Sequence, residues 1–144
     1  MNWTMMTGVL AMAASFSTSP ASAQSDLDAL RWKHRVLVLL APASDDPGMA
    51  RQSEQLLAQA PELAERDLVI FAVAPDQVRT IYGNASANSP AKEWHRHFEW
   101  APSQGFKAVL VGKDGGVKWR SDGPFEIEDL NAVIDAMPMR RGSR

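Results

Sequence analysis

Two adjacent carboxylates are the first candidates for chemistry in this sequence. Asp45 and Asp46 follow Ser44 in the segment after an apolar run, and they stand immediately before Pro47. Neighbouring carboxylates in a strand-to-helix loop can act as acid and base or hold a divalent cation. An Asp before a proline is also typical of a helix cap, because its carboxylate accepts backbone N–H bonds and meets the positive end of the helix dipole. We favour the cap, and a carboxylate-based, cation-dependent hydrolytic enzyme is the alternative.

The other polar side chains offer weaker chemistry. His95 and His97 are two apart in a predicted helix, so their side chains point about 200° apart and cannot bind one metal together. Ser44 has no His-Asp relay in its neighbourhood, and P-loop, G-x-G-x-x-G and H-E-x-x-H motifs are absent. The chain contains no cysteine, which excludes thiol oxidoreductase, thiol peroxidase and cysteine-based zinc chemistry. We therefore expect a protein that is not an enzyme and that has no cofactor.

The composition indicates a single domain with no strong electrostatic field. The chain has 144 residues, of which 45% are hydrophobic, and its formal net charge is −2. One core can be filled without crosslinks, and neither nucleic acid nor a membrane surface is indicated as a partner. We expect a domain over residues 24–144 with a core at about 27–138 and a basic tail, whose partner is an unknown protein or small ligand. The arginines of the tail are Arg140, Arg141 and Arg144.

The first 23 residues have the pattern of a secretory signal peptide. They contain no charged side chain, have an apolar centre from Met5 to Phe16, and end in Ala21-Ser22-Ala23, a small-x-small cleavage pattern. The apolar centre is shorter than the roughly 20 residues that span a bilayer. The pattern predicts cleavage after Ala23, a mature protein without a membrane span, and a periplasmic or secreted location.

Hydrophobic periodicity and turn residues predict the elements that position these side chains. Two unbroken apolar runs predict strands covered on both faces, and the helix between them makes a β-α-β unit. Asp46 and Pro47 predict the start of that helix, its predicted apolar stripe includes Leu57, and its predicted wet side includes Gln52. In chain order, the sequence first predicts a short packing helix that is capped by Ser25 and contains Trp32. It then predicts a strand at Val36–Leu40, a helix over Met49–Ala60 ended by Pro61, strands at Leu68–Val73 and Val78–Tyr82, a helix with Ala91, Trp94 and Phe98 on its apolar face, a hairpin within Gly105–Ser121, and a helix from about Phe125 to Met137.

The hairpin has the clearest local pattern. Ala108–Val111 is a continuous apolar run, and Asp114-Gly115-Gly116 supplies residues that tolerate the positive φ of a tight turn. The return strand alternates, which predicts that Val117 and Trp119 face the core while the basic residues beside them face water.

This order of elements is that of the thioredoxin-like fold, and four separated segments resemble one family with that fold. The chain resembles the uncharacterised bacterial branch of the DUDES domain family, which is related to domains of sushi-repeat and extracellular-matrix proteins. The segments are Leu30–Val36 (LRWKHRV), Glu65–Leu68 (ERDL), Gly112–Lys118 (GKDGGVK) and Ile134–Arg140 (IDAMPMR).

The resemblance implies an α/β fold with a central mixed sheet flanked by helices, an envelope or extracellular setting, and a non-catalytic binding or accessory role. Alignment with a thioredoxin places Ser44-Asp45-Asp46-Pro47 where the two redox cysteines would lie, and Lys107 where the active-site proline would lie. Trp100 follows a helix near a proline, and we expect it to be the most exposed tryptophan and a binding residue. The predicted interaction surface consists of Ser44, Asp45, Asp46, Trp100, Phe106 and Lys107.

Overall fold

A computed structural model describes residues 22–137, which form a five-stranded mixed sheet with the strand order β3-β2-β1-β4-β5. β1 and β2 are parallel, and the other neighbouring pairs are antiparallel. The predicted α/β class with a mixed sheet is confirmed. The basic tail, and the predicted signal peptide up to residue 21, lie outside the described residues. The strands are β1 (Arg35–Leu40), β2 (Leu68–Val73), β3 (Val78–Tyr82), β4 (Lys107–Val111) and β5 (Val117–Ser121).

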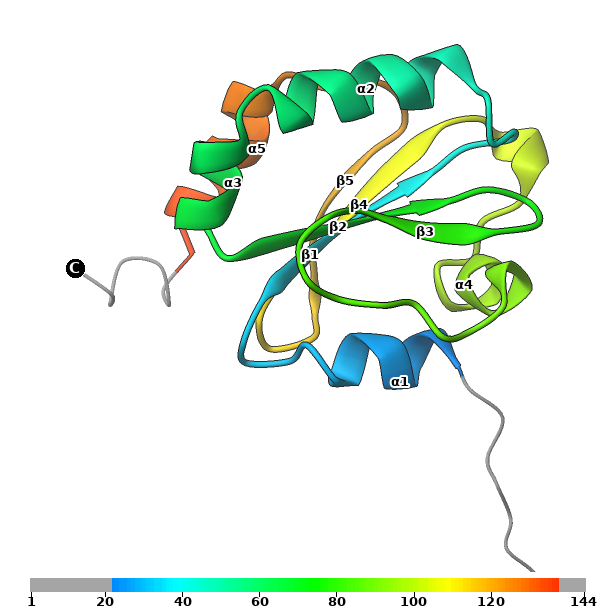
Figure 1. The fold of residues 1–144 in the computed structure, drawn as a ribbon, viewed down its shortest axis with the longest axis horizontal. Coiled ribbons are helices and arrows are strands. Elements are labelled where there is room, and N and C mark those ends of the chain that lie inside the picture. Colours follow the sequence, from blue (N-terminus) through cyan, green and yellow to red (C-terminus); the bar gives the residue numbers. More distant parts are fainter. Residues whose placement is uncertain (1–21, 138–144) are drawn as a thin grey trace, which may run out of the picture.

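Helices cover both faces of the sheet (Figure 1). Side chains alternate along β1, so Leu37 and Leu39 enter one apolar cluster and Val36 and Val38 enter the other. All residues of β1 and β2 are buried, which confirms that these two strands are central. The helices on one face are α2 (Pro47–Leu57), α3 (Ala60–Glu65) and α5 (Ile127–Asp135); those on the other are α1 (Ala23–Asp28) and α4 (Ala91–His97), and a 3₁₀ turn, η1 (Pro102–Gln104), precedes β4.

The start of α2 agrees with the prediction, but its end does not. Pro47 is the first helical residue, and the carboxylate of Asp46 accepts the Met49 backbone N–H at 2.9 Å. The helix ends at Leu57, and a separate helix, α3, begins at Ala60 with Pro61 in its first turn. The prediction that Pro61 ends a helix is therefore wrong. A proline is accommodated in a first turn because the N–H groups there have no intrahelical partner.

Two side chains of α2 face the opposite way from the prediction. Gln52 is only 1% exposed, and its amide bonds the backbone of Phe125 through N–H···O contacts of 3.0 and 3.3 Å. Leu57, assigned to the apolar stripe, is exposed. The polar Gln52 is tolerated in the core because it satisfies both backbone groups of Phe125, which hydrophobic periodicity cannot reveal.

The hairpin forms as predicted, except at one position. β4 is buried from Ala108 to Val111, and Gly115 has a φ of 86° in the turn. The strand register shifts within the hairpin: Leu110 pairs with Trp119, but the next residue of β4, Val111, pairs with Val117, so that Lys118 is an extra residue in β5. This irregularity turns Val117 away from the side of Trp119, so Val117 is exposed while Trp119 packs against Phe125. The prediction that Val117 faces the core is wrong.

The remaining helices pack as their apolar positions predict. Trp94 of α4 and Leu130 and Ile134 of α5 have no exposed surface. The N-cap of α1 is Ser22, so the prediction that Ser25 caps this helix is wrong. Ser25 is the third residue of the helix, and its side chain bonds to the backbone of Ser22. The two serines form a capping box, an arrangement that shifts the helix start three residues earlier than a single cap at Ser25.

Candidate functional site

The β1–α2 loop and the start of β4 lie at the same end of the sheet. Lys107 pairs with Leu40, the last residue of β1, and Ser44, Asp45 and Asp46 follow that strand. The space beside Ser44 is only about 10 Å³, at or below what one water molecule requires. The polar residues of the predicted surface therefore lie at the same end of the sheet, but the described residues beside Ser44 leave no cavity large enough for a ligand.

Trp100 is not an exposed residue of that surface, so this part of the prediction is wrong. It is 4% exposed, its ring packs at 5.0 Å from that of His95, and its Nε1 donates to the Gly105 carbonyl at 2.9 Å. Glu99 has a φ of 51°, a left-handed conformation after α4 that turns the chain back toward the sheet. Phe106 is half-buried and packs against the apolar cluster below α2.

The two histidines of α4 have separate surroundings. Nε2 of His95 lies 3.0 Å from the Ala74 carbonyl, whereas the ring of His97 packs edge-on against Phe98. No group of three or more His, Cys, Asp or Glu side chains suited to a metal occurs within residues 22–137. In the same range, no helix has the length and apolar character needed to cross a membrane.

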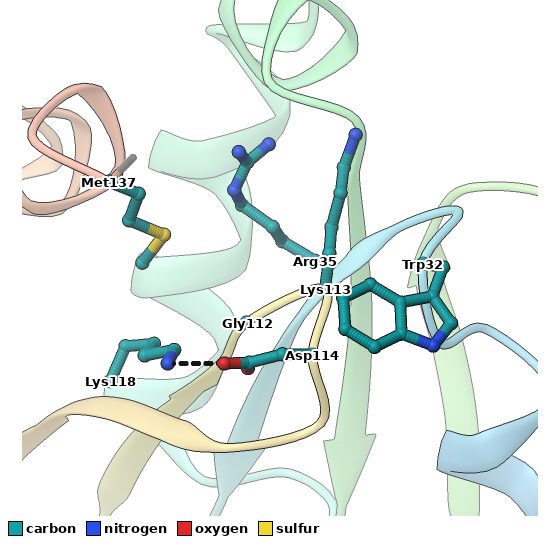
Figure 2. A pocket seen from close by; sticks show the side chains of 7 residues that line it. All are labelled: Trp32, Arg35, Gly112, Lys113, Asp114, Lys118 and Met137. Carbon is teal, nitrogen blue, oxygen red and sulfur yellow. Dashed lines mark hydrogen bonds and ion pairs between the residues drawn. The ribbon is translucent and has the colours of Figure 1, made fainter. Parts of the chain in front are cut away.

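A larger cavity opens at the opposite end of the sheet, where β1 begins and β4 ends (Figure 2). It has a volume of about 330 Å³ and is lined mostly by carbon atoms. We call it the Trp32 cleft. Its lining residues are Trp32, Arg35, Gly112, Lys113, Asp114, Lys118 and Met137.

Trp32 is held at the mouth of this cleft in an uncommon conformation. Its side chain is the most exposed large hydrophobic group described, at 60%, and its φ is 68°. A left-handed conformation is strained for a bulky residue and persists only where the surroundings impose it. Here the Trp32 N–H donates to the Lys113 carbonyl at 2.6 Å, and the Arg31 guanidinium lies 5.5 Å from the centre of the indole ring. The backbone of Trp32 is thus held at the mouth of the cleft, and the Arg31 guanidinium lies beside its indole ring.

Ion pairs fix the two lysines that line the cleft. Lys113 Nζ contacts Asp67 at 2.8 Å, and Lys118 Nζ contacts Asp114 at 2.7 Å. The hydrogen bond from Lys113 lowers the pKa of Asp67, and the bond from Lys118, with that from a backbone N–H, lowers the pKa of Asp114. Both carboxylates are therefore ionised at neutral pH, and each partly offsets its lysine.

Buried arginines connect the helices and strands around the cleft. Arg66 makes a two-pronged contact with Asp135 of α5, with N–O distances of 2.9 and 3.1 Å, and a further bond of 2.7 Å to Glu62 of α3. Arg35 donates to the Arg66 carbonyl at 2.9 Å. This bidentate geometry fixes α5 against the end of α3, and so positions Met137, which follows α5, at the cleft wall.

The four segments that carry the family resemblance are the sequence signal for this cleft. They meet at this end of the sheet, where they supply Trp32 and Arg35, Arg66 and Asp67, the hairpin turn, and Asp135 with Met137. Local pattern could not identify their convergence, because it depends on contacts between segments far apart in the chain.

Comparisons with known proteins agree with the fold. The chain is 28% identical over 138 residues to coiled-coil domain-containing protein 80 of Danio rerio, a match that covers 85% of this chain and only 16% of that protein. A crystal structure of a cysteine-to-serine mutant of peroxiredoxin 6 from Arenicola marina matches with a TM-score of 0.54 and 13% identity, over 76% of this chain and 63% of that one. This likeness confirms the predicted thioredoxin-like fold. Residues 26–142 match the family described as a domain of unknown function (DUF4174), and the chain belongs to that family.

Proposed function

We propose that this protein is an exported thioredoxin-like domain that acts by binding a ligand or partner in the periplasm or outside the cell, and that it does not catalyse thiol chemistry. The exposed Trp32 carries the proposal. A large exposed aromatic side chain that lines a cavity is the type of residue that dominates binding energies. No cysteine exists in the chain to support redox catalysis.

The proposal includes membership of the DUDES domain family and of its bacterial branch. The convergence of the four resembling segments on the Trp32 cleft supports it, since a shared site would explain why the likeness concentrates there. Similarity to part of a zebrafish protein also supports a family with animal members.

The competing function is a cation-dependent hydrolase that uses Asp45 and Asp46, and no specific contact favours it. Asp46 already accepts the Met49 N–H as a cap, and Asp45 is exposed. The interaction surface predicted around Ser44 and Lys107 stays a prediction, to be compared with the Trp32 cleft by experiment.

A thermal-shift screen tests the binding role. Fractions of a cell-envelope extract are added to the purified exported protein, to a Trp32→Ala variant, and to a Leu57→Ala variant, which removes an exposed hydrophobic residue from α2. A ligand that binds only the folded state raises the melting temperature by mass action. We expect at least one fraction to stabilise the wild type and Leu57→Ala but not Trp32→Ala. If no fraction stabilises the wild type, or if stabilisation is the same in all three proteins, the binding role at Trp32 is wrong.

A further inference from the structure

One residue of the hairpin turn, Lys113, contacts two segments that are far apart in the chain. Its backbone carbonyl accepts the Trp32 N–H at 2.6 Å, and its Nζ contacts the Asp67 carboxylate at 2.8 Å. Trp32 lies in the turn before β1, whereas Asp67 lies in the turn between α3 and β2. Both turns are therefore connected through one residue, which also lines the Trp32 cleft.

The two residues that Lys113 contacts share an uncommon backbone conformation. Within residues 22–137, Trp32 and Asp67 are two of three residues other than glycine with a positive φ, at 68° and 51°. Aspartate tolerates this conformation, and left-handed residues are common directly after a helix, where Asp67 lies. A bulky indole tolerates it less well and needs surroundings that impose it. Trp32 is therefore the strained residue of the two, and its bond to the Lys113 carbonyl is a contact that can impose the strain.

The turn that carries Trp32 also rests on the hairpin through Arg31. Gly115 has a φ of 86°, and a Cβ at this position would lie 3.4 Å from the Arg31 Nε, so the Arg31 side chain covers the glycine. The Arg31 guanidinium also lies 5.5 Å from the centre of the Trp32 ring. The hairpin turn is therefore a support for both the backbone of Trp32 and the side chain beside its indole.

Lys113 is the better placed of the two ion-paired lysines at the cleft to hold this support in place. Its side chain is 16% exposed, against 37% for Lys118, and an ion pair with a largely buried partner is screened less by solvent. Figure 2 shows the Lys113 side chain directed away from the contact between Lys118 and Asp114. Because Asp67 itself is half exposed, the restraint from its pair with Lys113 is expected to be moderate.

We propose that Lys113 is a positioning residue for Trp32, and that its ion pair with Asp67 is a latch that holds the hairpin turn against the Trp32 turn. When the pair is broken, the Trp32 N–H leaves the Lys113 carbonyl more often and the indole spends less time at the mouth of the cleft. This inference rests on the proposed binding function and specifies how that site is regulated. A ligand that contacts Trp32 is coupled to Asp67, although Asp67 does not line the cleft, and the coupling is reciprocal.

Hydrogen exchange of the Trp32 backbone N–H measures the latch without any ligand. Exchange in the isotopically labelled exported protein is compared with that of the β1 amides, which report opening of the whole sheet. Lys113→Met removes the Nζ but keeps the carbonyl, and it should accelerate exchange at Trp32 about threefold or more relative to β1. Lys118→Met is the matched control, because it removes the other cleft lysine that is paired with an aspartate, and it should change exchange at Trp32 less than about twofold.

Asp67→Asn tests the same ion pair from its other end. Asparagine tolerates a left-handed conformation, so this substitution removes the charge without changing the backbone preference at the position. We expect a similar acceleration at Trp32, and no further acceleration beyond about twofold when Asp67→Asn is combined with Lys113→Met, since both changes remove one contact.

The envelope fraction that stabilises the wild type shows whether the latch regulates binding. Asp67→Asn should need about threefold or more of that fraction for the same rise in melting temperature, because its binding-competent form is populated less. Asp122→Asn is the control, since it breaks the ion pair of Lys107 near the opposite end of the sheet, and it should need the same amount within about twofold.

Each outcome decides the inference. Acceleration at Trp32 below about threefold in Lys113→Met, an equal acceleration in Lys118→Met, or additive effects in the double variant would overturn the latch. Equal responses of Asp67→Asn and Asp122→Asn to the fraction would overturn its role in regulating the site. If no fraction stabilises the wild type, the proposed binding function fails, and the exchange measurement still decides separately whether Lys113 positions Trp32.

Discussion

Replacement of Asp46 distinguishes a helix cap from a catalytic or cation-binding carboxylate. One Asp46 oxygen accepts the Met49 N–H at 2.9 Å at the start of the eleven-residue helix α2. Removal of such a cap costs about 1 kcal/mol of stability. For a domain of this size, Asp46→Ala should lower the melting temperature by roughly 3 to 6 °C. Asp45→Ala should cost less, because Asp45 is exposed and makes no cap bond.

Thermal unfolding followed by circular dichroism, with EDTA, calcium or magnesium, provides the assay. Asp46→Asn is the informative control, because asparagine caps a helix as well as aspartate but lacks the charge that a hard cation requires. We expect Asp46→Asn to melt near the wild type under all three conditions. The cap explanation is refuted if EDTA destabilises the wild type, and calcium or magnesium restores it only while both carboxylates are present.

Four further predictions concern export, redox chemistry, pH and the core. Intact-mass measurement of the exported protein should find a chain that begins at residue 24, cleaved after Ala23, so that it lacks the Ser22 cap and the buried Ala23 that begin α1 in the uncleaved chain; a full-length chain kept in the cytoplasm contradicts the export prediction. The purified protein should not reduce insulin disulfides above a buffer blank, because the reaction needs a cysteine thiolate, and reproducible turnover would refute this. The pKa values of Asp67 and Asp114 are lower in the folded chain than in the unfolded chain. Their contribution to the free energy of unfolding is therefore complete above the unfolded pKa of about 4. It is lost as the pH falls through the lower pKa values of the folded chain. Unfolding free energies measured between pH 2 and 6 should show a shallower acid loss when both are asparagine, and an unchanged slope would contradict the assignment. Gln52→Ala should destabilise the fold by about 2 kcal/mol or more in urea unfolding, because it leaves the buried backbone of Phe125 without partners, and a loss below about 0.5 kcal/mol would contradict that role.

Sequence patterns were sufficient wherever neighbouring residues decide the structure. The unbroken runs of β1 and β2 require cover on both faces, and the structure supplies it. The pair Asp46-Pro47 specifies the start of α2, since both residues act on the first turn itself. The same holds for the hairpin turn at Gly115.

Patterns failed where contacts between distant segments decide. Trp100 looked exposed from its neighbours, but the left-handed Glu99 and a bond to Gly105 turn its ring inward. Trp32 looked like a packing residue, but a bond to Lys113 of the hairpin holds it at the surface. The sequence therefore predicts a binding surface in the loop after β1, whereas the cavity beside Trp32 lies at the opposite end of the sheet.

The most direct test of a ligand site at the Trp32 cleft is an NMR shift map of the exported protein, recorded with the envelope fraction that raises its melting temperature. We expect the largest backbone shifts at Trp32, Gly112 and Lys113, with little change in the loop from Ala41 to Met49. Shifts concentrated in that loop and at Lys107, with Trp32 unchanged, would contradict the cleft and place the interaction at the end of the sheet where the redox site of thioredoxins would lie.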